Sequence, residues 1–269
     1  MDVHAVLDDL VDEQRALDGV VADLAPDQWM LPTPSPRWSI TDQIGHLTFF
    51  DTTAALAITD AGGFAEHRRD LVASFADERM LDDATLGSFR LLAPAERLAE
   101  WRRRRDELHA AGRTLSDDTR VEWYGPSMGA KSFLTARLME VWAHGQDVCD
   151  AVGARRPPSD RLRHIAQLGV ITRGWSYTVR GATPPDGEVR VELTAPSGDV
   201  WTWGADDAPA AVIGPAEDFC LGGTHRRHGD DTALTLEGFA ARDWMLVAQA
   251  FAGAPTQGPS AHQAAGRHH

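Results

Sequence analysis

The sequence predicts an N-terminal helical bundle followed by a small α+β domain. Over long stretches of residues 1–182, apolar residues recur at spacings of three and four, which is the pattern of amphipathic helices. A turn-rich segment, Thr183-Pro-Pro-Asp-Gly187, follows, and beyond it short runs rich in β-branched residues replace the helical pattern. We therefore expect a helical domain over residues 1–182, an α+β domain over 183–253 and a disordered tail over 254–269.

The composition limits the partners of the chain. Hydrophobic residues make up 43% and charged residues 25%, which allows a sizeable core. The net charge of −14 disfavours nucleic acid and anionic membrane surfaces, because phosphate groups repel an acidic protein. No apolar run approaches the roughly 18 residues of a membrane span, and the N-terminal segment is acidic rather than signal-like. We expect a cytoplasmic protein, monomeric or homodimeric, with Cys149 and Cys220 as free thiols.

Two helices are expected at the start of the chain. Residues 4–24 carry a broad apolar stripe, and the prolines between residues 26 and 36 make the next segment an extended loop. Ser39 is followed three residues later by Asp42, the capping-box pattern that opens a helix. This second helix should contain His46 and end near Ile58, before two consecutive glycines.

The rest of the first domain is expected to be helical as well. Residues 65–92 should form one or two helices, and Pro94 should open another that ends near Ala111. The arginine run at 102–105 in that helix is interpreted as a solvated, ion-paired face rather than a nucleic-acid patch. A long helix should span about 130–152, and a further one about 160–179.

The second domain should alternate strands and helices. Residues 189–194 and 200–203 should form strands joined by a hairpin turn, with a third strand near 211–213. After these strands we expect a helix over 215–226, a strand over 232–237 and a last helix over 240–252.

A pair of potential metal ligands lies on the long helix over 130–152. Glu140 and His144 are four residues apart, so both side chains project from one face and can reach the same divalent ion. Such a pair is also common as an ordinary surface or capping pair. His46, on the second helix, supplies the third ligand that the pair lacks, although a lone histidine there is also explained as a buried, hydrogen-bonded core residue. Three ligands with an open position are typical of catalytic zinc.

The residues around these ligands resemble a known family. Trp38, Asp42, His46 and Leu47 are followed about ninety residues later by Arg137, Glu140, Trp142, His144, Asp147 and Val148. This pattern resembles the DinB-like superfamily, and most closely its mycothiol-dependent maleylpyruvate isomerase branch in actinobacteria. The resemblance implies a four-helix bundle, a metal triad of His46, Glu140 and His144, and a C-terminal α/β domain.

The resemblance also implies a chemistry. A bound divalent metal, zinc being the expected ion, would activate a low-molecular-weight thiol, expected to be mycothiol, for S-transfer to or isomerisation of a small electrophile. No catalytic residue is expected beyond the metal centre. Asp147 is expected to orient His144 through its other ring nitrogen, and Asp42 is a further candidate for this supporting role, although its capping role already explains it.

Anionic groups of the substrate or thiol would need cations. Arg226, Arg227 and Arg180 are candidates, with surface ion pairing as an equally good explanation. Two other functions stay open at this point. The chain could be a non-enzymatic metal-containing protein that binds a small ligand, for which its nine tryptophans would suit. It could also be a hydrolase in which the metal activates water.

Overall fold

The computed structural model describes residues 2–74, 77–256 and 258–261. The chain divides into two compact units, Met1–Arg156 and Pro157–His269, which are described separately. We expected the division after residue 182. The difference arises because α7 (Leu162–Ile171) and α8 (Arg173–Thr178) pack on helices of the second unit. Periodicity shows that a helix has an apolar face, but it does not show which partner covers that face.

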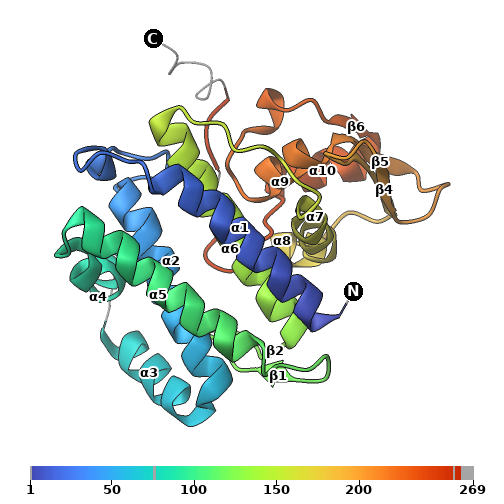
Figure 1. Ribbon diagram of the computed structural model, residues 1–269. Coiled ribbons are helices and arrows are strands. Elements are labelled where there is room, and N and C mark those ends of the chain that lie inside the picture. The colour runs from blue at the N-terminus through green and yellow to red at the C-terminus, as the bar shows by residue number, and fades with distance from the viewer. Residues whose placement is uncertain (1, 75–76, 257, 262–269) are drawn as a thin grey trace. The chain divides into compact units, whose positions relative to one another are not determined.

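Four long helices form the first unit (Figure 1). They are α1 (Val3–Val21), α2 (Ile40–Thr59), α5 (Pro94–Gly112) and α6 (Ala130–Val152). α2 packs against α5 and α6, and α1 packs against the same two helices. The core between them is mainly apolar, and its fully buried members include Leu7, Leu10, Leu17, Ile44, Leu47, Trp101, Leu108, Leu134 and Leu138.

Short-range hydrogen bonds fix both ends of α2. At its start, Ser39 and Asp42 form the predicted capping box, with the Asp42 carboxylate accepting from the Ser39 backbone at 2.8 Å. The loop before it contains η1 (Gln28–Met30). At its end, α3 (Ala61–Ser74) begins where two glycines had predicted a break. Asp60 accounts for this, because its carboxylate accepts from the Gly63 backbone and caps the new helix.

The remaining elements of the first unit connect the long helices. α3 and α4 (Glu78–Arg90) both pack on α2. After α5 the chain forms a short antiparallel pair, β1 (Arg120–Val121) and β2 (Met128–Gly129), directly before α6. α6 begins and ends where the sequence predicted, and Gly153 closes it in the left-handed conformation that glycine adopts without strain.

The second unit is built around a sheet with strand order β4-β3-β5-β6. The strands are β3 (Val189–Thr194), β4 (Val200–Trp203), β5 (Ala210–Pro215) and β6 (Thr235–Glu237). β3 is antiparallel to β4 and parallel to β5, whereas β5 and β6 are antiparallel. α9 (Ala216–Gly223) packs on β3 and β5, and α10 (Gly238–Val247) packs on β5 and α8. A short helix, η2 (Gly229–Asp231), lies between α9 and β6.

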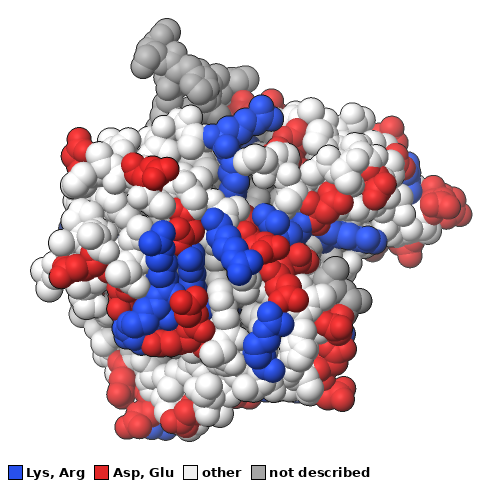
Figure 2. Space-filling view, in the orientation of Figure 1, with Lys and Arg blue, Asp and Glu red and all other residues white. Residues whose placement is uncertain are grey.

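The arginine run on α5 is ion-paired, as the sequence predicted. Arg102 and Arg105 contact Asp18 on α1, each at 2.6 Å. Arg103 and Arg104 each pair with Glu100 and Glu107 on their own helix. Figure 2 shows this intermixing of basic and acidic side chains on one face of the molecule. The run therefore adds no free cationic patch that would attract a polyanion.

None of the helices in the described ranges is both long and apolar enough to cross a membrane.

Candidate metal centre

Three potential ligands meet between α2 and α6. The Glu140 Oε2 atom lies 3.3 Å from His46 Nε2 and 3.1 Å from His144 Nε2. The three ligand atoms lie within 4.8 Å of one another, and no other such group of three occurs among the described residues. Helical spacing explains half of this arrangement, because Glu140 and His144 are one turn apart on α6. The packing of α2 against α6 brings His46 to the same point.

The electrostatics of the group favour metal-binding protonation states. Burial lowers the pKa of His46 to about 4, with the neighbouring His144 adding to this effect and Glu140 opposing it. The imidazole of His46 is therefore neutral near pH 7 and can donate a lone pair. Burial opposes ionisation of Glu140, but its contacts with the His144 and His46 rings outweigh burial and hold the pKa of Glu140 well below its usual range.

Gln43 fixes the ring of His144, a role that sequence analysis missed. Its Oε1 atom lies 2.5 Å from His144 Nδ1, and its Nε2 atom donates to Thr33 Oγ1 at 2.9 Å. The Thr33 hydroxyl donates its proton to the Trp38 carbonyl, so it must accept the hydrogen bond from Gln43. The amide orientation follows, and Gln43 Oε1 can only accept a proton from Nδ1. In a neutral His144 ring, the lone pair of Nε2 therefore faces Glu140.

The two carboxylates expected to support the site have other partners. Asp147 was expected on His144 Nδ1, where the structure places Gln43; Asp147 Oδ2 accepts from Ser35 Oγ at 2.9 Å. Asp42 completes the α2 capping box and pairs with Arg90 at 2.7 Å. A sequence signal for Gln43 did exist. It is a polar residue one turn before His46 on the same helix, and its side chain is completely buried.

Aromatic rings surround the histidines. The Trp38 indole lies 5.1 Å from the His46 ring and stacks on His144 at 5.8 Å between ring centroids. Phe50 contacts His46 at 4.6 Å, and beyond Phe50 lies Tyr124, whose hydroxyl is 2.9 Å from His67 Nε2. Such rings exclude water from one side of the group and strengthen electrostatic interactions within it.

A second set of polar residues, here called the buried network, lies in the same bundle. Arg137 on α6 donates to Asp51 on α2 at 3.0 Å, and Gln14 on α1 donates to the other oxygen of Asp51 at 3.1 Å. The Oε1 atom of Gln14 is hydrogen-bonded to His109 Nε2 on α5. Burial raises the pKa of Asp51, and Arg137 opposes this shift. The positive charge of Arg137 also contributes to the lowered pKa of His46.

The cationic candidates of the second unit are held by local contacts. Arg180 donates to the Ser176 carbonyl, the Gln249 side chain and the Thr256 carbonyl. Arg226 and Arg227 donate to the carbonyls of Thr224 and Arg226. All three belong to the unit that does not contain the ligand group.

His225 and His228 of the second unit make local contacts. His225 uses both ring nitrogens in contacts with Thr256 and the Ala248 carbonyl. His228 accepts from the Asp230 backbone.

The ligand group fits a divalent ion. In a tetrahedral zinc site, ligand atoms about 2.0–2.1 Å from the ion lie about 3.3 Å from each other. Two of the three separations, 3.3 and 3.1 Å, match this edge length, and all three ligand atoms lie within 4.8 Å of one another. Two imidazole nitrogens and one carboxylate oxygen are also the donor set of many catalytic zinc sites.

Fold and ligand group together define a class: a helical-bundle protein with three potential metal ligands on two helices, joined to a separate α+β unit. Residues 10–149 match the family model described as the mycothiol maleylpyruvate isomerase N-terminal domain, and the chain belongs to this family. Residues 185–236 match a second model, described as wyosine base formation.

Known relatives and structures agree with this assignment. The chain is 46% identical over 250 residues to uncharacterized proteins from two strains of Mycobacterium tuberculosis, CDC 1551 and H37Rv, covering 93% of this chain and 96% of each relative. Crystal structures of the mycothiol-dependent maleylpyruvate isomerase and of a histidine-to-alanine mutant of it are similar, with TM-scores of 0.57 and 0.58. At 15% identity, covering 90% of this chain and 96% of those chains, this likeness shows a shared fold.

Proposed function

We propose that the protein is a divalent-metal-dependent enzyme that uses a low-molecular-weight thiol, mycothiol, as the nucleophile in S-transfer to, or isomerisation of, a small electrophile. The family assignment supports a thiol-dependent isomerase or transferase. The proposed metal ligands are His46, Glu140 and His144, whose donor atoms converge.

The observation that carries the proposal is the orientation of His144. Because Gln43 Oε1 accepts the proton on Nδ1 of His144, a neutral His144 ring has its lone pair on Nε2. This lone pair faces Glu140 Oε2, an acceptor 3.1 Å from Nε2. Two acceptors this close repel each other unless a proton or a cation lies between them.

The chain's own residues prepare the site for this chemistry. A divalent ion held there would lower the pKa of a thiol that binds it, so that the sulfur reacts as a thiolate near neutral pH. Gln43 keeps the Nε2 lone pair of His144 available, and the neutral His46 offers a second one. Trp38 and Phe50 cover the histidine rings and limit competing attack by water.

Metal analysis tests the ligand group. We expect purified protein to carry close to one equivalent of zinc per chain, and His46→Ala and His144→Ala each to lose it. His4→Ala is the matched control, because His4 lies at the start of α1, contacts the Leu115 carbonyl and is not part of the ligand group, so this variant should retain the metal. Wild-type metal content in both ligand variants would show that the group is structural.

Thiol binding separates the proposed chemistry from the alternatives. Calorimetry should show that mycothiol binds zinc-loaded protein and binds EDTA-treated protein at least about tenfold more weakly. Maleylpyruvate, the substrate named for the similar crystal structure, is the first electrophile to assay. A protein that does not bind the thiol but cleaves esters or amides would be a hydrolase. A protein that binds small molecules without turning them over would be a binding protein.

A further inference from the structure

A strip of partly exposed side chains begins at the ligand group and follows α2 and α6. Over residues 40–51 of α2, the side chains that are not buried are His46, Phe49 and Phe50. Over residues 133–145 of α6, they are Thr135, Ala136, Glu140 and His144. Residues four apart on a helix lie on one face. The exposed surface of α2 therefore continues from His46 to Phe50, and that of α6 continues from Glu140 to Ala136.

The register of the two helices places Phe50 and Ala136 at the same level. Three contacts between the helices give this register: Gln43 to His144, His46 to Glu140 and Asp51 to Arg137. Residue numbers therefore rise along α2 as they fall along α6. Phe50 follows His46 by four residues, and Ala136 precedes Glu140 by four. Both lie one helical turn, about 5.4 Å, beyond the ligand group in the same direction.

Aromatic rings of the loop between β1 and β2 extend this surface. The Tyr124 ring meets Phe50 edge to face at 5.6 Å between ring centroids, and the Trp123 ring lies 6.1 Å from Phe50. Trp123 also stacks at 5.5 Å on Phe64, which is fully buried and holds the loop in place. Trp123 and Tyr124 themselves remain partly exposed. The name aromatic strip is used below for Phe49, Phe50, Trp123, Tyr124 and Ala136.

A polar pair lies at the far end of the aromatic strip. The Tyr124 hydroxyl is 2.9 Å from His67 Nε2 on α3. Burial raises the pKa of Tyr124, whereas a hydrogen bond from Thr53 and the positive charge of Arg137 oppose this shift. Tyr124 therefore presents an uncharged hydroxyl near neutral pH. Such a group suits a neutral polar atom at one end of an otherwise apolar molecule.

Two cations border the aromatic strip, and both have partners. The Arg137 guanidinium lies 5.8 Å from the Phe50 ring centroid and is paired with Asp51 at 3.0 Å, both side chains being buried. Moving Arg137 to an incoming anion would leave Asp51 as an unpaired buried charge, which is strongly unfavourable. Arg68 donates to the Trp123 carbonyl at 2.8 Å. Aromatic rings without a free charge among them favour a flat, uncharged ring, which they contact by stacking or edge to face.

We propose that the aromatic strip binds an uncharged aromatic ring of the electrophile, stacked against Phe50, with a polar substituent at Tyr124. The opposite end of such a molecule lies at the ligand group, one helical turn away. Its role as the electrophile rests on the proposed function. Binding of the ring does not, because no residue of the aromatic strip belongs to the ligand group.

The two tyrosines of the chain provide the test. Full-length protein is labelled with ring-¹³C tyrosine and treated with EDTA, and the Tyr124 signals are identified by their loss in Tyr124→Phe. Tyr177 is the internal control, because it is buried in the second unit. Acetophenone should shift the Tyr124 signals saturably and leave those of Tyr177 unchanged. Cyclohexyl methyl ketone has the same carbon skeleton and carbonyl group but a saturated ring, and it should bind at least about threefold more weakly.

Two variants locate the bound ring. Ala136→Leu extends a larger side chain over the aromatic strip and should weaken acetophenone binding at least about tenfold. Ala99→Leu is its matched control, because Ala99 is exposed on α5, and its affinity should equal that of the wild type. Phe50→Leu keeps an apolar side chain but removes the ring, and it should weaken binding about threefold to tenfold. Circular dichroism verifies the folding of each variant, and Phe50→Leu decides the test if Ala136→Leu does not fold.

Three results would each overturn the assignment. They are the absence of a saturable shift at Tyr124, equal binding of cyclohexyl methyl ketone, and an unchanged affinity in the folded variants. Benzoate that binds more tightly than acetophenone would show that a cation such as Arg68 governs binding instead. A protein that retains no zinc but binds acetophenone at Tyr124 would refute the proposed function and leave the aromatic strip standing. Zinc retention and mycothiol binding without any acetophenone shift would refute the aromatic strip alone.

Discussion

Two polar groups lie within the same helical bundle, and they are built in opposite ways. In the buried network, Arg137, Asp51, Gln14 and His109 form a continuous series of donors and acceptors from α6 to α5. In the ligand group, His46 and His144 instead direct their Nε2 atoms at the same oxygen of Glu140. The first arrangement alternates donors and acceptors, although Arg137 Nε has no hydrogen-bond partner among the described residues. The second, with neutral imidazole rings, directs acceptors at one another unless a proton or a cation joins them.

The comparison shows that burial alone does not identify a functional site. Asp51 and the side chain of Arg137 are more deeply buried than any of the three ligands. What distinguishes the ligand group is that three potential ligands converge on one point and that Gln43 accepts the Nδ1 proton of one of them, His144. The four predictions that follow test whether the buried network serves stability and the ligand group serves binding.

The largest effect on stability should come from breaking the buried network. Asp51→Ala leaves the guanidinium group of Arg137 buried without its carboxylate, which should lower the free energy of unfolding by about 3–5 kcal/mol. Urea denaturation of EDTA-treated protein measures this change. The double variant Asp51→Leu/Arg137→Leu removes both charges and should recover most of the loss. If the stability loss of the double variant equals the sum of the losses in Asp51→Leu and Arg137→Leu, the two side chains are not energetically coupled.

Zinc should separate the two groups. At a free concentration 100 times its Kd, zinc should raise the free energy of unfolding of the wild type by about 2.7 kcal/mol. Asp51→Ala should gain the same increment, because the network holds no ligand, and Glu140→Ala should gain none. An equal gain in Glu140→Ala would mean that zinc binds elsewhere in the chain.

The sequence predicted much of the fold from local patterns. α6, β3 and β4 have the predicted bounds, because caps, glycines and alternation are properties of neighbouring residues. The predicted helix over 160–179 is divided into α7 and α8, and both belong to the second unit. That placement depends on which faces meet in three dimensions, and no local pattern specifies it.

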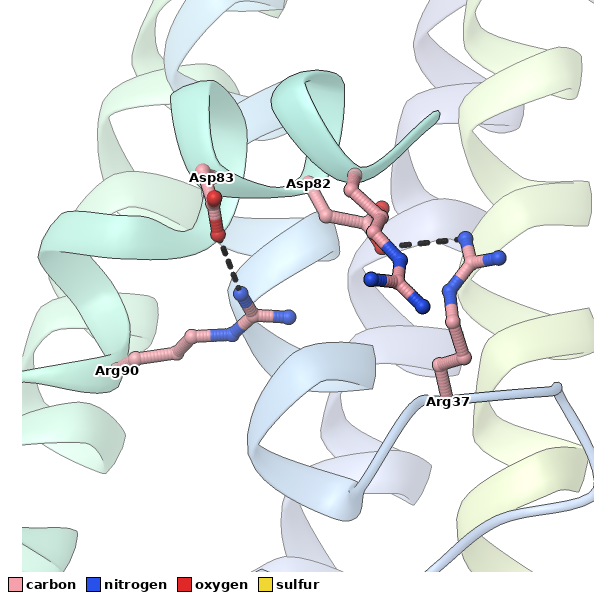
Figure 3. Close-up of a pocket in the computed structure, with 5 residues that line it drawn as sticks. Arg37, Asp82, Asp83 and Arg90 are labelled. Carbon is pink, nitrogen blue, oxygen red and sulfur yellow. Dashed lines mark hydrogen bonds and ion pairs between the residues drawn. The ribbon is translucent and has the colours of Figure 1, made fainter. Parts of the chain in front are cut away.

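The candidate site shows the same limit. Spacing placed Glu140 and His144 on one face of a helix, and a family resemblance added His46. The assignment of Asp147 to His144 also rested on spacing along one helix, but the partner of Nδ1 comes from another helix, where Gln43 lies. Likewise, Arg37 pairs with Asp82 of α4, which lies 45 positions further along the chain (Figure 3). Contacts between helices require the packing itself.

Gln43 tests how the ligand group is oriented. Gln43→Leu removes the acceptor for the Nδ1 proton of His144 and should lower zinc affinity about 10–100-fold. Gln43→Glu keeps an acceptor and should lose much less. Asp147→Asn should leave affinity within about twofold of the wild type, because Gln43 occupies the nitrogen in question. Competition with a chromophoric chelator measures all three, and a larger loss in Asp147→Asn than in Gln43→Leu would reverse the two roles.

The smallest effect concerns the end of the buried network at His109. Burial lowers the pKa of His109 to about 4, whereas an unfolded histidine has a pKa near 6.5. Above pH 6.5 the residue is neutral in both states and contributes nothing to pH dependence. As the pH falls from 6.5 to 4, the unfolded chain takes up a proton that the folded protein does not, so stability decreases.

His109→Gln can still donate to Gln14 but cannot titrate. Its stability deficit relative to the wild type should therefore shrink by about 1–2 kcal/mol between pH 7.5 and 4.5, after allowance for the partial exposure of His109. All other titrating groups, His46 included, are common to both proteins and cancel in this difference. A deficit that stays constant across this pH range would show that His109 titrates normally and that the network does not exclude the proton.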